Sequence, residues 1–285
     1  VNPNEVDTTF TLGKHKFSVP IVAASMDGVV DVKFAIAMGK LGGIAVLNLD
    51  GIQTRYDNPD EILKQIANAS PEEATKLVQS LYDGKKFPVK DKLIAKRVEE
   101  IKKAKVPAIV SCIPQNAEHF YNVAKEAGVD IFIVQSTVAT VRHIATEYKI
   151  LDVEKFCSKA KTPIIIGNVV TYDMAVELME VGASAILVGI GPGAACTSRG
   201  VLGIGVPQIT ATVDCAAARD YYFKRRGKYV PIITDGGMRI GGEICKAFAA
   251  GSDAVMVGSA FAKAEEAPGR GYHWGMATSH ANLPR

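Results

Sequence analysis

Hydrophobic and polar positions alternate in blocks along the 285-residue chain. Short runs rich in β-branched residues recur, and most of them end next to a polar residue or a glycine. Continuous apolar runs of this length are typical of strands buried on both faces, as in parallel sheets. The predicted strands cover residues 20–25, 43–48, 108–113, 131–136, 163–168, 185–190, 231–236 and 254–259.

Segments with helical spacing of apolar residues lie between these runs, and most end in glycine, which commonly follows a helix C-terminus. Eight alternations of strand and helix predict an α/β fold, a single-domain (β/α)8 TIM barrel over residues 1–285. A doubly wound open sheet is the alternative. The connection between the second and third strands is longer than a barrel needs, so we expect extra helices at about residues 51–106.

Composition and charge narrow the range of partners. The chain carries 33 basic and 30 acidic residues, a net charge of +3, which indicates neither a nucleic-acid nor a membrane surface. No apolar run is long enough to cross a bilayer. The lysine-rich run 90–105 is expected to form the solvated face of a helix. Five scattered cysteines without a CxxC pair indicate reduced thiols and a cytoplasmic location.

One cysteine stands where a barrel places its chemistry, on the loops that follow the strands. Cys196 lies in GIGPGAACTSRG (189–200), after the predicted sixth strand, among small residues that let a ligand approach the backbone. A free cysteine often acts only as a small hydrophobe, but this position favours a nucleophile. Thr197 and Ser198 add hydroxyls that can orient a water or a leaving group.

Glycines and one carboxylate follow the last two predicted strands. Gly236 and Gly237, with Gly258 and Ser259, offer N–H groups and a hydroxyl where barrels commonly bind phosphate. Asp235 binds a ribose diol or, alternatively, only caps a turn. The sequence has no HExxH motif and no clustered histidines, so metal catalysis is not expected. A dinucleotide would bind without a GxGxxG fingerprint.

Taken together, these loops resemble the IMP dehydrogenase/GMP reductase family, in its short branch without the CBS regulatory domain. The stretches that carry the resemblance keep their order and spacing. They are IVAASMDGVVD (21–31), GGIAVLN (42–48), IIIGNVVT (164–171), GIGPGAACTSRG (189–200), PIITDGGMRIGGEICKAFAAGSDAVMVGSAFA (231–262) and EEAPG (265–269).

The resemblance implies an NAD(P)-dependent oxidoreductase of purine metabolism whose cysteine attacks C2 of IMP, GMP or XMP. A reductase expels ammonia from GMP and takes hydride from NADPH to give IMP. A dehydrogenase passes hydride from IMP to NAD and hydrolyses the resulting thioimidate to XMP. The resemblance also implies a homo-oligomer, a tetramer or octamer, and a monovalent cation such as K+.

Site roles follow from the resemblance position by position. Cys196 matches the nucleophile, Ser198 the hydroxyl residue two positions beyond it, and Asp235 the ribose-binding carboxylate. The positions that match contacts to the nucleotide or its phosphate are Met26, Asn168, Gly237, Gly258, Ser259, Gly275 and Met276. The strand-four end, where the cofactor is expected, holds Gln135, Ser136 and Thr137. The cation loop corresponds to the carbonyls of Gly191, Gly193 and Cys196.

Several positions depart from the family pattern. Ala194 replaces a serine that touches phosphate, and Gln135 replaces an aspartate that faces the nicotinamide ribose. Asn48 stands where reductases carry a catalytic lysine, and HWGM (273–276) replaces YRGM.

The sequence contains features that favour each of the two reactions, GMP reduction and IMP oxidation. Dehydrogenases of the family often insert a CBS module in the strand-two connection, and here the connection has only short helices, which favours a GMP reductase, our prediction. The missing lysine favours an IMP dehydrogenase. Two further hypotheses stay open: a degenerate barrel that binds nucleotide as a sensor, and a phosphate-binding lyase or epimerase.

Overall fold

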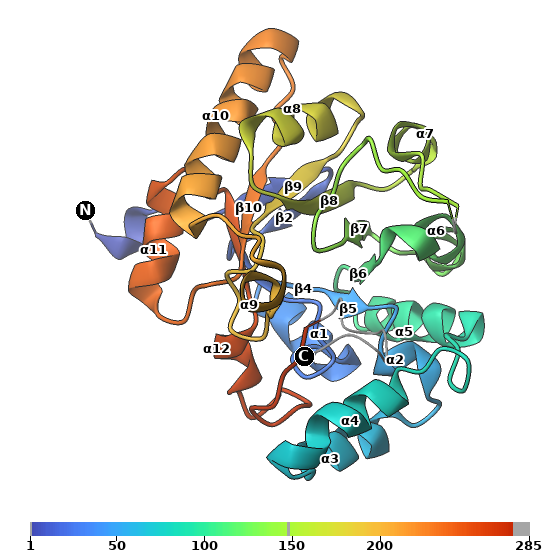
Figure 1. Ribbon diagram of the computed structural model, residues 1–285. Coiled ribbons are helices and arrows are strands. Elements are labelled where there is room, and N and C mark those ends of the chain that lie inside the picture. The colour runs from blue at the N-terminus through green and yellow to red at the C-terminus, as the bar shows by residue number, and fades with distance from the viewer. Residues whose placement is uncertain (1, 147–148, 276–285) are drawn as a thin grey trace.

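The computed structural model describes residues 2–146 and 149–275 and shows a barrel of parallel strands surrounded by helices (Figure 1). The sheet has the order β4-β3-β11-β10-β9-β8-β7-β6-β5, and all its pairs are parallel. The predicted TIM barrel is confirmed. Its strands are β3 (Ile21–Ala23), β4 (Ile44–Ala45), β5 (Leu47–Asn48), β6 (Ile109–Cys112), β7 (Ile131–Gln135), β8 (Ile164–Val169), β9 (Ala185–Val188), β10 (Ile232–Asp235) and β11 (Ala254–Val257).

The second predicted strand, residues 43–48, is divided into β4 and β5 at Val46. β4 pairs with β3, whereas β5 pairs with β6, so the two pieces together close the sheet into a barrel. The backbone stays bonded across the break, because Val46 N donates to Ala23 O (3.1 Å) and Leu49 N donates to Ser111 O (2.8 Å). One strand thus changes partner along its length.

Helices follow the strands around the outside of the barrel (Figure 1). In the described part of the chain, no helix is long and apolar enough to cross a membrane. The helices are α1 (Val32–Lys40), α2 (Ile52–Arg55), α3 (Pro59–Ala67), α4 (Pro71–Leu81), α5 (Asp91–Lys103), α6 (Ala117–Glu126), α7 (Val153–Lys159), α8 (Tyr172–Glu180), α9 (Ser198–Leu202), α10 (Gln208–Arg226), α11 (Gly241–Ala249) and α12 (Ser259–Ala262), with short 3-10 turns at Pro3–Glu5 and Pro114–Asn116.

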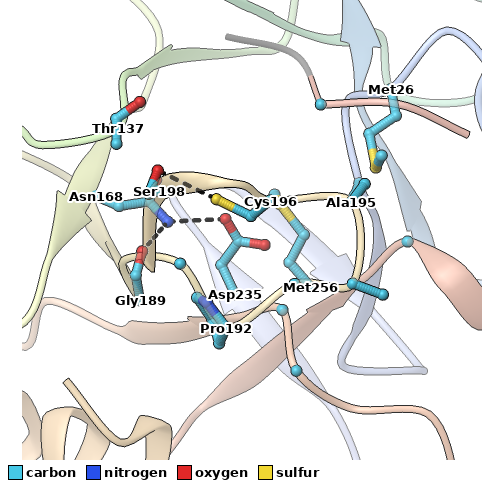
Figure 2. Close-up of a pocket in the computed structure, with 18 of the residues that line it drawn as sticks. Met26, Thr137, Asn168, Gly189, Pro192, Ala195, Cys196, Ser198, Asp235 and Met256 are labelled. Atoms are coloured by element: carbon cyan, nitrogen blue, oxygen red, sulfur yellow. Dashed lines mark hydrogen bonds between the residues drawn. The ribbon is translucent and has the colours of Figure 1, made fainter. Parts of the chain in front are cut away.

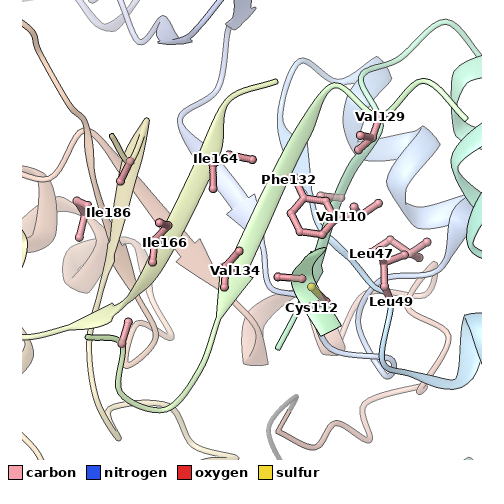
Figure 3. Close-up of a cluster of buried hydrophobic side chains, with 14 of the residues drawn as sticks. Leu47, Leu49, Val110, Cys112, Val129, Phe132, Val134, Ile164, Ile166 and Ile186 are labelled. Atoms are coloured by element: carbon pink, nitrogen blue, oxygen red, sulfur yellow. The ribbon is translucent and has the colours of Figure 1, made fainter. Parts of the chain in front are cut away.

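The period of two along each strand divides the core into two layers. Ile131 and Ile133 of β7 pack inside the barrel, whereas Phe132 and Val134 pack outward against the helices (Figure 3). The inner layer also contains residues of a hairpin, β1 (Phe10–Leu12) and β2 (His15–Phe17), which precedes the barrel. Both faces of the strands are therefore buried, as their continuous apolar runs predicted.

The long strand-two connection forms helices α2 to α5, and α3 and α4 lie outside the barrel at one side (Figure 1). The lysine-rich run forms α5, which buries Leu93, Ile94, Val98 and Ile101 while most of its lysines stay at the surface. A third apolar cluster joins α2, α3 and α4 to the far end of the chain. Its buried members are Ile52, Leu63, Ile66, Val78, Leu81, Tyr82 and Trp274.

Candidate functional site

A cavity of about 550 Å³ lies at the carboxyl ends of the barrel strands. Figure 2 shows Cys196 and Asp235 in its centre, with Met26 and Thr137 on opposite sides. The sequence-predicted site residues all line it except Met276, which lies outside the described residues. The cavity brings together Met26, Gln135, Ser136, Thr137, Asn168, Gly191, Gly193, Cys196, Thr197, Ser198, Asp235, Gly236, Gly237, Gly258, Ser259 and Gly275.

The loop that carries Cys196 is fixed from both of its ends. Arg199 donates from Nε to Ile190 O (3.4 Å) and from a terminal nitrogen to Val206 O (2.5 Å). Pro192 packs so closely on Gly237 that a Cβ there would lie 3.0 Å from its own Cβ, and Gly237 has a φ of +82°. Glycine is therefore required at this crossing, because the two loops touch and the backbone is left-handed.

Cys196 is exposed, and its Sγ donates to Ser198 Oγ at 3.3 Å (Figure 2). Its backbone N–H donates to Gly193 O (3.0 Å), which closes a turn under the thiol. Burial raises the pKa of Cys157 to about 11 and that of Cys215 to about 12, so these thiols are poor sources of thiolate. Of the described residues that line the cavity, Cys196 is the only cysteine.

Asp235 lies on the cavity floor at the end of β10. Its Oδ2 accepts hydrogen bonds from the side-chain amides of Asn168 (2.8 Å) and Gln135 (3.0 Å). Asn168 also donates to Gly189 O (2.9 Å), and Ser25 Oγ donates to Gln135 Oε1 (3.0 Å). Burial raises the pKa of Asp235 to about 6, although the two amide donors oppose this shift. No described residue donates to Oδ1, so one carboxylate oxygen is left for a ligand.

The loops after β10 and β11 meet at one side of the cavity. Gly236 has a φ of +83°, and its N–H donates to Met256 O of the neighbouring strand (3.0 Å). Ser259 Oγ lies 3.0 Å from His273 Nε2, which brings the last described segment of the chain to the same side. An imidazole, a hydroxyl and glycine backbone thus line this side, a set suited to an oxygen-rich anion.

Ser136 and Thr137 form the rim after β7. The Ser136 hydroxyl donates to Val138 O (2.8 Å), and its N–H donates to Gly167 O (2.8 Å), so its place on the rim is fixed. Val201 and Leu202 of α9 also line the cavity, and both side chains are exposed. The cavity lining therefore combines small polar groups with open apolar surface.

Comparison with known proteins identifies the lineage of this site. Residues 1–278 match the family model described as the IMP dehydrogenase / GMP reductase domain. The chain belongs to this family. An uncharacterized oxidoreductase of Mycobacterium tuberculosis is 35% identical over 288 residues, which cover 99% of this chain and 76% of that protein. The chain is thus an oxidoreductase of the IMP dehydrogenase/GMP reductase family.

A named enzyme and a solved structure also match. The inosine-5'-monophosphate dehydrogenase of Cryptosporidium parvum is 34% identical over 275 residues, 94% of this chain and 66% of that protein. The crystal structure of an IMP dehydrogenase/GMP reductase-like protein from Corynebacterium glutamicum matches with a TM-score of 0.92 and 33% identity. That match covers 99% of this chain and 74% of the other.

Asn48, which the resemblance aligns with a lysine of the reductases, is buried and is not among the residues that line the cavity. Its Nδ2 donates to Asp27 Oδ2 (3.3 Å), and its Oδ1 accepts the N–H of Asp50 (3.0 Å). These two bonds hold the side chain between Asp27 and Asp50 and not at the cavity lining. Within the described ranges, no group of three or more His, Cys, Asp or Glu side chains could hold a metal ion.

Sequence reasoning missed several contributors to the site, including His273, Gln208 and Met256. His273 was noticed only as a departure from YRGM, although it lines the cavity. Gln208 supports the floor from behind, because its Nε2 donates to Val188 O (2.7 Å) and Asp235 O (3.2 Å). Met256 reaches the cavity from inside β11, where nothing in an apolar run distinguishes it from its neighbours.

Proposed function

We propose that the chain is a purine nucleotide oxidoreductase that forms a covalent thioimidate between Cys196 and C2 of the base, and that it acts as a GMP reductase. One observation carries this proposal: the exposed Cys196 shares a cavity with the partly buried Asp235 carboxylate. A nucleophile near a carboxylate that can accept ribose hydroxyls suits a substrate whose base and sugar are covalently joined.

The nucleotide extends from Asp235 toward the loops after β10 and β11. Asp235 Oδ1 accepts the ribose hydroxyls, since Oδ2 is already bonded to two amides. The phosphate lies against Gly236, Gly237, Gly258 and Ser259. The base lies over Cys196. By the resemblance to the family, Met26, Asn168, Gly275 and Met276 line the nucleotide.

The cysteine works by addition and elimination. The Cys196 thiolate adds to C2 of GMP, and the amino group leaves as ammonia after taking up a proton, which gives the thioimidate. Hydride addition at C2 then expels the thiolate and yields IMP. The Ser198 hydroxyl, 3.3 Å from Sγ, can donate to the sulfur once the thiol has lost its proton. Thr197 supplies a second hydroxyl beside it.

The cofactor is NADPH or NAD, and the residues present fit its nicotinamide end. Thr137 lies across the cavity from Met26 (Figure 2), and the exposed Val201 and Leu202 offer apolar surface at the mouth. When bound, the nicotinamide supplies or accepts the hydride at C2. Ser136 and Thr137 provide polar groups at its edge, next to Gln135.

An IMP dehydrogenase is the second candidate, favoured by one observation. The buried Asn48 gives ammonia release no lysine to protonate it, whereas hydrolysis of the thioimidate to XMP does not need one. The strand-two connection favours the reductase, because it contains only short helices such as α3 and α4 where dehydrogenases of the family often insert a CBS module.

Further properties follow from the family. We propose that residues 1–285 form one catalytic barrel without a CBS domain, working as a homotetramer or octamer with reduced thiols in the cytoplasm. A K+ ion would bind the carbonyls of Gly191, Gly193 and Cys196. The Gly193 carbonyl already accepts one N–H, which leaves it one lone pair for the cation.

Nicotinamide absorbance in two parallel reactions tests the proposal. One holds the protein with GMP and NADPH, the other with IMP, NAD and potassium chloride. Loss of absorbance in the first identifies a GMP reductase, and a gain in the second an IMP dehydrogenase. If neither changes while IMP or GMP still binds, the chain is a nucleotide-binding sensor and the proposed activity is wrong.

A further inference from the structure

A chain of hydrogen bonds connects three distant parts of the sequence beside the cavity. Trp274 Nε1 donates to the Tyr82 hydroxyl (2.7 Å), and that hydroxyl in turn donates to Asp27 Oδ2. Asp27 follows β3, Tyr82 ends α4, and Trp274 belongs to the last described segment. All three side chains are buried.

Asp27, at the end of this series of hydrogen bonds, is held in place by further donors. Asn48 Nδ2 donates to its Oδ2 (3.3 Å), and Ile52 N donates to its Oδ1 (3.0 Å). Burial raises the pKa of Asp27, and these donors with Tyr82 oppose the shift. Removing one donor from a buried carboxylate costs free energy of folding. The hydrogen bond to Asp27 therefore stabilises the position of the Tyr82 hydroxyl.

Trp274 is also part of the apolar core under α3 and α4. It packs in one cluster with Ile52, Ile66 and Tyr82, and Tyr272 packs against the same cluster. The indole of Trp274 is therefore buried in the apolar cluster that these helices form.

The neighbours of Trp274 lie in the cavity wall. His273 and Gly275 both line the cavity, and His273 Nε2 lies 3.0 Å from Ser259 Oγ. The segment is held on its other side by Gly28, where an added Cβ would lie 2.4 Å from Tyr272 O. Trp274, between the two lining residues, does not line the cavity, and its indole N–H donates to Tyr82 instead.

We propose that Tyr82 is a positioning residue for nucleotide binding: it fixes Trp274 and so holds His273 and Gly275 in the cavity wall. The helices α3 and α4 are then the platform on which this wall is mounted. The inference rests on the proposed function for the identity of the ligand, but not for the contact itself. Tyr82 does not line the cavity, and it acts on the cavity wall through Trp274.

The chain contains its own reporter, because Trp274 is its only tryptophan. Tyr82→Phe removes one hydroxyl and keeps the ring in the cluster. Tyr56→Phe is the matched control, since Tyr56 packs against the same cluster and its hydroxyl donates to Leu81 O (2.8 Å), not to Trp274. Fluorescence of the full chain is measured for both variants, without ligand and during titration with IMP and with GMP.

We expect Tyr82→Phe to shift the Trp274 emission and increase its quenching by acrylamide, while Tyr56→Phe leaves both unchanged. Nucleotide dissociation constants should rise by about five- to ten-fold in Tyr82→Phe, the range for one lost hydrogen bond to a buried group. The rate of Cys196 alkylation by iodoacetamide should stay at the wild-type value. Weaker nucleotide binding with unchanged Cys196 alkylation would indicate a local displacement of the cavity wall, whereas general loosening of the fold would also change the alkylation rate.

Two results would overturn the proposal. One is an unchanged Trp274 emission in Tyr82→Phe, which would contradict the positioning whatever ligand binds. The other is equal nucleotide affinity in both variants and the wild type, which would make the contact purely structural. If the wild type binds neither nucleotide but Trp274 responds to Tyr82→Phe, the proposed function fails, and with it the claim for nucleotide binding, while the positioning of the wall stands.

Discussion

The side-chain amide of Gln135 donates to Asp235 Oδ2 at 3.0 Å and lies with Asn168 on one oxygen of that carboxylate. Gln135 ends β7 and Asp235 ends β10, so two strand ends share one polar group on the cavity floor. An amide can make this contact without charge repulsion, whereas an aspartate or glutamate at position 135 would face a second carboxylate. Gln135 therefore supports the proposed ribose site from the side assigned to the cofactor.

Replacing Gln135 should weaken nucleotide binding more than cofactor binding. Gln135→Leu removes the donor to Asp235, and we expect KM for the nucleotide to rise about ten-fold or more, since one hydrogen bond to a charged group contributes about 1.5–3 kcal/mol. Gln135→Glu should be worse, because it adds a like charge. Steady-state kinetics with each substrate varied in turn measure the split. A rise confined to the KM of the nicotinamide cofactor would assign Gln135 to the cofactor instead.

Nucleotide affinity should depend on pH through Asp235, whose pKa burial raises to about 6. The ionised carboxylate accepts ribose hydroxyls best, so affinity should rise with pH through about 6 and then level off. The stability of the ligand-free protein should change with pH in the opposite direction. The folded state keeps the Asp235 proton to a higher pH than the unfolded chain does, so the contribution of Asp235 to the free energy of unfolding falls as the pH rises from 3.8 to about 6.

The nucleotide phosphate also titrates near pH 6, with a second pKa of about 6, so the binding experiment needs a ligand without it. Inosine keeps the ribose and base and isolates Asp235. Calorimetric titration of inosine should show the rise in the wild type and a flat profile in Asp235→Asn. A flat profile in the wild type would mean that Asp235 does not bind the ribose.

Removing the thiol should stop catalysis and spare binding. Cys196→Ala is expected to lower turnover by about three orders of magnitude or more, because no second nucleophile forms the covalent intermediate. Its affinity for IMP or GMP should stay close to the wild-type value. Cys245→Ala is the control, since Cys245 is exposed on α11. Retained turnover in Cys196→Ala would exclude the covalent mechanism.

The hairpin before the barrel should matter for stability and not for kinetics. Phe10 is buried in the inner layer of the core, and Phe10→Ala is expected to cost about 3–5 kcal/mol in the free energy of unfolding. Thr11 in the same strand is exposed, so Thr11→Ala should change it by no more than about 0.5 kcal/mol. Urea denaturation measures both. A changed KM in folded Phe10→Ala protein would show that the hairpin reaches the site.

Much of the fold follows from local pattern. Short continuous apolar runs identified the strands, and the order of strands in a barrel then put Cys196, Asp235 and Ser259 on one face. The break at Val46 could not be predicted, because residues 44–47 are all apolar and nothing distinguishes Val46 from its neighbours. Only pairing with β3 on one side and β6 on the other decides where that strand changes partner.

Contacts between side chains far apart in the sequence could not be predicted from the sequence. Gln135 was assigned to the cofactor by its position at a strand end, and nothing local indicates that its amide meets Asp235, 100 positions away. Tyr82 and Trp274 lie 192 positions apart, and each is unremarkable in its own segment. Such contacts depend on how loops fold over the barrel mouth, which hydrophobic periodicity does not encode.

A covalent bond between Cys196 and C2 of the nucleotide is tested most directly by mass spectrometry of protein quenched in acid during turnover. The wild type should carry a purine nucleotide adduct on the peptide that contains Cys196, formed from GMP or from IMP with NAD. Cys196→Ala should carry none. Measurable turnover with no adduct on that peptide, at times shorter than one catalytic cycle, would contradict the thioimidate mechanism.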